Sequence, residues 1–135
     1  MGELRPPLDA LLLLLVDRMS GVIRERVEAC GLSMPQAVAL RYLEQPCPMR
    51  NLARAMRCDA SNLTGIADRL EERGLAVRRL DPDDRRVKLL VLTESGLAMR
   101  AAIHRRISSD IAGLERLGPA ERELLAELLW RVVRE

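Results

Sequence analysis

Two groups of side chains in this sequence have the chemistry to bind nucleic acid. The first is small and polar: Asn62 can hydrogen-bond the edge of adenine, and Ser61 and Thr64 can bond base edges or phosphate. The second is the charged run 78–86, in which arginines flank aspartates and can make bidentate contacts with guanine or phosphate. Either group could also be ordinary solvent-exposed surface, so the elements that carry them decide the interpretation.

The polar group lies on a predicted helix that begins at Asp59 and ends at Gly74. Asp59 can cap the free amides of the first turn, and the apolar residues fall at helical spacing. The inward residues are Leu63, Ile66, Ala67 and Leu70, and the outward or marginal ones are Ala60, Ser61, Asn62, Thr64, Gly65, Asp68 and Arg69. This small polar face can sit in a major groove, although such helices also serve as protein contacts.

The charged run lies between two predicted strands, Leu75–Val77 and Val87–Leu92. Two short helices precede the Asp59 helix: Ser33 and Pro35 open one that runs through Glu44, and Met49–Met56 forms the other. A short helix, a tight turn and a second helix form a helix-turn-helix. The strand pair that follows is then a wing.

These residues carry a family resemblance. The run Asp81–Thr93, preceded by Asp68–Leu75, closely resembles the MarR family of bacterial winged helix-turn-helix regulators. The resemblance implies a mainly α fold with a small β-wing and terminal dimerisation helices. It also implies a homodimeric transcriptional regulator, a ligand-responsive repressor, that binds double-stranded DNA at a pseudo-palindromic operator. Family members commonly bind phenolic or other amphipathic effectors between the dimer region and the DNA-binding lobe.

The resemblance also assigns roles to individual residues. Arg85 matches the arginine that enters the minor groove, and Asp83 matches the acid that positions it. Gly65 departs from the long polar side chain that is frequent in the family, so it either allows close approach to DNA or lacks one contact. The expected base contacts are Ser61, Asn62, Thr64, Gly65 and Arg85. The phosphate candidates, chosen by charge and location alone, are Arg50, Arg57, Arg69, Arg73, Arg78, Arg79 and Arg86.

The outer segments predict an association surface. The first half of the predicted helix Leu8–Ala29 is apolar on too many sides to face one core, and either a partner subunit or the C-terminal helices can cover it. After a cap at Thr93, a helix is expected to carry Ile103, Ile107, Ile111 and Leu114 until Gly118–Pro119 breaks it, and Ala120–Arg134 forms the last helix. The expected dimer contacts are Leu11, Leu12, Leu15, Leu128 and Trp130. The chain then divides into 1–32 and 93–135 for dimerisation and 33–92 for DNA binding.

Composition excludes several other classes. The 135 residues fit one structural unit, and no catalytic motif or phosphate-binding glycine loop is present, so an enzyme is not expected. Net charge is only +2, but ten of the 22 basic residues and seven of the 20 acidic ones lie between Cys47 and Leu92. A G+C-rich genome could equally explain the arginine bias. No cofactor or metal is expected.

The cysteines leave open an alternative function, redox sensing. Cys30, Cys47 and Cys58 match no disulfide or metal spacing, and His104 is the only histidine. Cys58 is expected to be buried, whereas Cys30 and Cys47 are candidates for a cysteine-based redox sensor. The apolar run Ala10–Val16 is too short to span a membrane, so the expected location is cytoplasmic. The other alternative is a winged-helix protein-interaction module.

Overall fold

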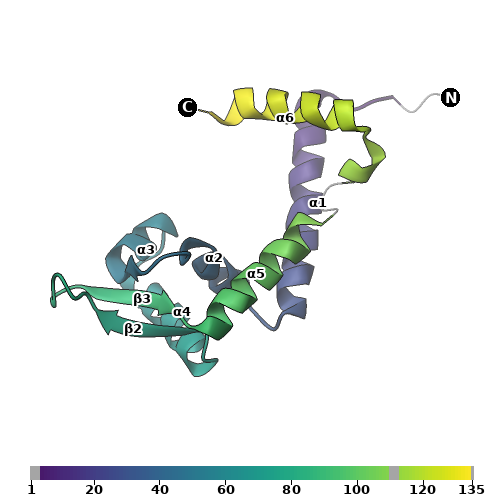
Figure 1. The fold of residues 1–135 in the computed structure, drawn as a ribbon. Helices are drawn as coiled ribbons and strands as arrows, with labels where there is room; N and C mark the ends of the chain where they lie inside the picture. Colours follow the sequence, from purple (N-terminus) through teal and green to yellow (C-terminus); the bar gives the residue numbers. More distant parts are fainter. Residues whose placement is uncertain (1–3, 110–112, 135) are drawn as a thin grey trace. The chain divides into compact units, whose positions relative to one another are not determined.

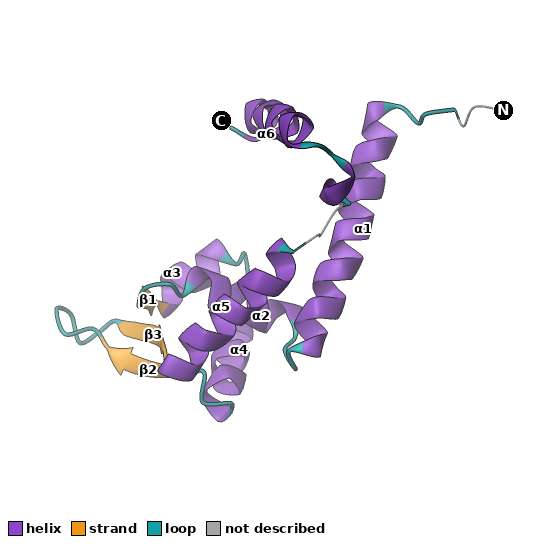
Figure 2. Ribbon diagram, turned by 45° about the vertical axis from the view of Figure 1, so that its right-hand side comes forward, coloured by secondary structure: helices purple, strands orange, loops and turns teal. Residues whose placement is uncertain are grey.

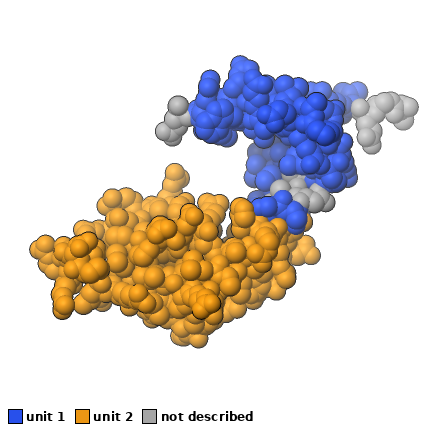
Figure 3. Space-filling model, viewed as in Figure 1, with its two compact units in different colours: residues 1–23, 107–135 blue, residues 24–106 orange. Residues whose placement is uncertain are grey.

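The computed structural model describes residues 4–109 and 113–134. The chain forms two compact units, residues 24–106 and the pair of segments 1–23 and 107–135, coloured separately in Figure 3. The elements in chain order are α1 (Leu8–Ala29), α2 (Met34–Tyr42), β1 (Cys47–Pro48), α3 (Met49–Ala55), α4 (Ala60–Glu72), β2 (Ala76–Leu80), β3 (Lys88–Leu92), α5 (Glu94–Ser108), the 3-10 helix η1 (Leu114–Arg116) and α6 (Pro119–Val133). The expected mainly α fold with a small β-wing is confirmed.

The sheet contains one strand more than the sequence predicted. Its order is β1-β3-β2, with both pairs antiparallel, and the two-residue strand β1 pairs Cys47 with Leu90. Strand β2 continues to Leu80 instead of ending at Val77, because its residues pair with β3 as far as Lys88. Figures 1 and 2 show the loop between β2 and β3 extending beyond the helices of residues 24–106.

The C-terminal helical region is shorter than expected. Helix α5 ends at Ser108, and Leu114 lies in η1 instead of on a continuous helix. Gly113, just before η1, has a left-handed φ of 74°, which an uninterrupted right-handed helix does not contain. The prediction that one helix carries Leu114 is therefore wrong, and Ile111 lies outside the described residues.

Helix α4 sits at the centre of the core of residues 24–106. Its inward residues Leu63, Ala67 and Leu70 are at most 1% exposed, and Ile66 is 7% exposed. The helix packs against α2, α3 and β2. Those elements contribute the fully buried side chains of Leu40 from α2 and Leu52 from α3. The apolar periodicity of the sequence therefore predicted the buried face of α4 correctly.

The start of α5 is fixed against the base of the wing. The Thr93 hydroxyl accepts the Gly96 N–H at 3.1 Å and donates to the Gly74 carbonyl at 2.6 Å, so the predicted cap is confirmed and also joins α5 to the end of α4. Gly96 lies so close to the wing that a Cβ there would be 1.9 Å from the Leu75 carbonyl oxygen. Only glycine fits at this position without a backbone shift.

We expect Gly96→Ala to lower the free energy of unfolding by about 1–3 kcal/mol or more, because the clash is with backbone rather than a flexible side chain. Gly65→Ala in α4 is the matched control, since a Cβ there meets nothing within 4 Å. That substitution should raise the free energy of unfolding by about 0.5–1 kcal/mol. Urea unfolding of both variants checks the prediction, and equal stability of the two would contradict it.

Candidate nucleic-acid interface

The first turn of α4 is organised by Asp59. Its carboxylate accepts the Asn62 N–H at 2.7 Å and the Ser61 hydroxyl at 2.8 Å. The bond from the Asn62 amide and then that from the Ser61 hydroxyl hold the pKa of the Asp59 carboxyl below its usual value. The cap is therefore ionised at neutral pH, and it fixes where the first outward residues of α4 point.

The outward face of α4 is polar and accessible. Ser61, Asn62 and Thr64 are exposed, and Gly65 is partly exposed with open space above it. The Thr64 hydroxyl donates to the Ala60 carbonyl at 2.9 Å, so it, like Ser61, already uses its proton within the helix. Within the described residues the side-chain amide of Asn62 has no partner. Of these three side chains, Asn62 alone has both its donors and its acceptor free.

The wing contains a carboxylate–arginine pair, one position later than the sequence suggested. Asp84 accepts the Arg86 backbone N–H and Nε, each at 3.1 Å, and Nη2 at 3.3 Å. Asp83 instead donates its own backbone N–H to Asp81 at 2.9 Å, and no pair between Asp83 and Arg85 is formed among the described residues. The expected pair is corrected to Asp84–Arg86.

The physical reason is the loop conformation, because both pairs have the same spacing in sequence. Asp81 and Val87 close the loop with a backbone bond of 2.9 Å, and the Val87 N–H bonds the Asp84 carbonyl. This turn brings the Arg86 amide and guanidinium onto one carboxylate. The side-chain bonds from Arg86, then its backbone N–H, lower the pKa of Asp84. The charge of Arg50 lowers it further.

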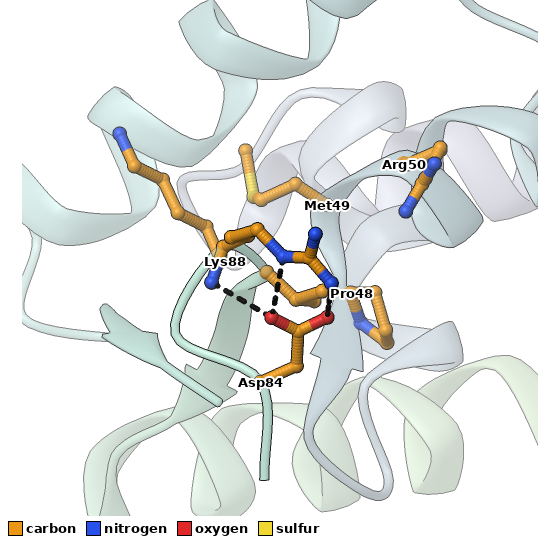
Figure 4. A pocket seen from close by; sticks show the side chains of 7 residues that line it. Pro48, Met49, Arg50, Asp84 and Lys88 are labelled. Carbon is orange, nitrogen blue, oxygen red and sulfur yellow. Dashed lines mark hydrogen bonds and ion pairs between the residues drawn. The ribbon is translucent and has the colours of Figure 1, made fainter. Parts of the chain in front are cut away.

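A pocket between the wing loop and the start of α3 gathers positive charge. It is lined by Pro48, Met49, Arg50, Asp84, Arg86, Val87 and Lys88 (Figure 4). In that view Arg50 lies on one side of the pocket, and Lys88 extends away from Asp84 on the other. Three cations and one carboxylate therefore line the pocket where α3 meets the wing, and the excess positive charge favours an approaching phosphate.

The arginines proposed as phosphate contacts differ in how far the protein itself uses them. Arg73 donates to the Gly31 carbonyl, and Arg78 bonds Asp68, Glu71 and the Thr64 carbonyl, so both are used within the protein. Arg86 is paired with Asp84 but remains exposed. Within the described part of the chain, no side-chain hydrogen bond or ion pair forms at Arg50, Arg57, Arg69 or Arg79, nor at Arg85, the expected base contact, so these are free to meet a ligand. Sequence reasoning missed the roles of Asp68, Glu71 and Asp84, because their partners depend on the fold.

The unit formed by residues 1–23 and 107–135 exposes apolar side chains. Leu12 is 43% exposed, Leu128 is 46% exposed and Trp130 is 63% exposed, while Leu11 and Leu15 are partly exposed. Among the described residues of this unit none is buried. A single chain therefore leaves this apolar surface uncovered.

The cysteines and His104 show no feature of a reactive or metal-binding site in the described residues. The three cysteines are free and half-buried, so the expectation that Cys58 is buried holds only in part. Burial raises the pKa of the Cys47 thiol, which disfavours the reactive thiolate. His104 is exposed.

In residues 4–109 and 113–134, no helix is long and apolar enough to cross a membrane, and no cluster of three or more potential metal ligands occurs.

Comparison with known proteins places the chain in a family. The model of the MarR family matches residues 32–88. The uncharacterized HTH-type transcriptional regulator YxaD of Bacillus subtilis is 32% identical over 96 residues, covering 69% of this chain and 67% of YxaD. The chain spans about half to two thirds of the length of the curated relatives it matches.

Solved structures agree on the fold over nearly the whole chain. Wild-type MarR from E. coli has a TM-score of 0.77 at 23% identity, covering 97% of this chain and 100% of MarR. A mutant MepR of S. aureus, bound to an oligodeoxyribonucleotide, has a TM-score of 0.72 at 19% identity, covering 96% of this chain and 97% of MepR. These relatives are transcription regulators and not enzymes. Together with this fold, the family model and the similarity to YxaD establish that the chain belongs to the MarR family of transcriptional regulators.

Proposed function

We propose that this regulator is a homodimeric repressor that binds a pseudo-palindromic operator with α4 in the major groove and the wing in the adjacent minor groove. The observation that carries the proposal is the division of α4 into a fully buried apolar face and an exposed polar one. An α-helix fits the major groove, and small polar side chains allow its backbone to approach the bases. The oligonucleotide bound to the MepR mutant supports the same role for this fold.

Asn62 is the proposed base reader on α4, because its amide can donate to and accept from an adenine edge and has no described partner in the protein. The hydroxyls of Ser61 and Thr64 can still accept a hydrogen bond directly from a base amino group. Bonding a phosphate oxygen or another acceptor requires the hydroxyl to turn away from its partner in the protein, or a bridging water. Gly65 contributes close approach instead of a side-chain contact. Arg50, Arg57, Arg69 and Arg79 are the proposed phosphate contacts, since their guanidinium groups are free of ion pairs in the described residues.

In the wing we assign the groove-reading role to Arg86 instead of Arg85. The argument from the family is that an acid orients the reading arginine, and the oriented guanidinium is that of Arg86. Its side chain is 91% exposed despite the pair, so it is both directed and accessible. Arg85, which has no described partner, then acts as an additional phosphate contact. A narrow A·T-rich minor groove would attract Arg86 most strongly.

The second copy of the chain is the proposed cover for the apolar side chains of α1 and α6. Contiguous apolar surface of this kind marks an interface more often than free surface. A dimer also presents two α4 helices to two half-sites, which accounts for an operator with two-fold symmetry. Release by a small phenolic or amphipathic molecule is proposed from family membership alone.

Selection of binding sites from a random pool of duplexes tests the function. We expect enrichment of a pseudo-palindrome whose half-sites are about 10 base pairs apart, with affinity that falls steeply as salt rises. A protein-interaction module would instead yield no enriched sequence and only weak, salt-sensitive binding. That outcome would refute the proposal.

Replacing the wing arginines separates their roles. Arg86→Ala should weaken operator binding by about 1–3 kcal/mol and remove the preference for A·T pairs beneath the wing. Arg85→Ala should act equally on all sequences and reduce the salt slope by about one phosphate contact. Salt titrations on the operator and on a version with G·C pairs beneath the wing measure both effects. If Arg85→Ala removes the preference and Arg86→Ala does not, the roles are reversed.

Deleting residues 120–135 tests the dimer. The truncated chain should aggregate or become monomeric and lose operator binding, because the deletion removes the proposed interface contacts Leu128 and Trp130. Analytical ultracentrifugation and gel shifts provide the measurement, with Trp130→Ala as a milder variant that should weaken association. A well-behaved monomer that still binds the operator with full affinity would rule out this role for the terminal helices.

A further inference from the structure

Arg78 joins the wing to the helix that carries the proposed base readers. Its Nη2 donates to Asp68 at 2.6 Å and to the Thr64 carbonyl at 3.2 Å, and its Nη1 donates to Glu71 at 2.6 Å. Arg78 belongs to β2, whereas all three acceptors belong to α4. One side chain therefore makes three hydrogen bonds between the wing and α4.

The backbone of Arg78 takes part in the same contact. Its N–H donates to the second carboxylate oxygen of Glu71 at 2.8 Å. In the antiparallel pair, Leu75 bonds Thr93 and Asp81 bonds Val87, so Arg78 falls at a position whose N–H points away from β3. Strand β2 is an edge strand, and Glu71 satisfies an amide that the sheet leaves unpaired.

The three acceptors lie along one stripe of α4. Thr64, Asp68 and Glu71 are separated by four and then three residues, which places them on the same side over two helical turns. Contacts spread over two turns restrict both sliding of the strand along the helix and rotation of the helix about its axis. A single contact would restrict both motions less.

Arg78 is also poorly suited to bind phosphate. Two carboxylates at 2.6 Å already neutralise its charge, and its side chain is only 24% exposed. The cluster of Arg78, Asp68 and Glu71 has a formal charge of −1, which repels a DNA backbone. A structural role between helix and wing therefore explains Arg78 better than a contact with DNA does.

We propose that Arg78, held by Glu71 and Asp68, is a positioning residue that fixes the wing relative to α4, so that helix and wing meet the two grooves in register. This role rests on the proposed DNA-binding function. Glu71 is the more informative partner to change, because it bonds both the backbone and the guanidinium of Arg78. If Arg78 bound phosphate, removing the Glu71 carboxylate would strengthen DNA binding without changing its sequence preference. If Arg78 positions the wing, the same change would reduce that preference.

The test compares binding to two duplexes that differ only beneath the wing, one with A·T pairs and one with G·C pairs. Wild type should prefer the A·T duplex by about tenfold. Glu71→Ala should bind the G·C duplex at least as well as wild type, since it removes an acid, but should lose most of the preference. Glu71→Gln retains an acceptor for the Arg78 N–H, so it should retain most of the preference for the A·T duplex. Arg78→Lys should behave like Glu71→Ala.

Arg79→Ala is the matched control, because Arg79 is adjacent on β2 and exposed. It should weaken binding to both duplexes equally and leave the preference intact. If Glu71→Ala binds both duplexes more tightly with the preference unchanged, the acid acts only through its charge and the proposal is overturned. Equal weakening on both duplexes by Arg78→Lys, as in Arg79→Ala, would make Arg78 a phosphate contact and also overturn it.

A measurement without DNA separates this proposal from the function itself. Spin labels at Ser61→Cys and Arg85→Cys, in a chain whose three natural cysteines are replaced by serine, report the distance between α4 and the wing. The distribution should be narrow in the parent and broader in Glu71→Ala. If wild type binds no DNA selectively but the distribution broadens, the DNA-binding function fails and the positioning contact stands. An unchanged distribution would overturn the positioning role.

Discussion

Burial of the inward face of α4 is the constraint on which the rest of the DNA-binding lobe depends. Leu63 and Leu70 are at most 1% exposed, and burying one leucine contributes about 1.5–3 kcal/mol. Successive residues of a helix are rotated by about 100°. Turning α4 by one position would expose these side chains, so the core fixes which residues face outward. The identity of the outward face, from Ser61 to Arg69, is thus set by aliphatic packing and not by the polar residues themselves.

The roles of the arginines depend on which acceptors the fold places beside them. Arg73 reaches the carbonyl of Gly31, just beyond the end of α1, and Arg78 reaches two acids on α4. Both are used in holding elements together. Arg86 meets one exposed acid and stays accessible, so its pair orients it without removing it from the surface. A surface rich in arginine therefore contains arginines that hold elements together and arginines that remain accessible, and charge alone does not distinguish them.

The sequence predicted what periodicity and capping determine. The bounds of α1, the buried face of α4 and the Thr93 cap all follow from patterns within one segment. Strand β1 was not predicted, because two residues, one of them Pro48, are too few to show a period. The Asp84–Arg86 pair was not predicted either, since Asp83 and Arg85 have the same spacing and only the loop conformation distinguishes the two pairs. The Arg78 network was also missed, because its partners lie on another element.

The two units differ in how far a single chain can stabilise them. Every apolar residue that is buried in the described part of the chain lies within 24–106, so this lobe has a core of its own. The terminal unit instead exposes leucines on α1 and Trp130 on α6. Aliphatic surface gains free energy wherever it is removed from water, so association would stabilise this unit most. Stability of the terminal unit should then depend on protein concentration, whereas the internal packing of the lobe should not.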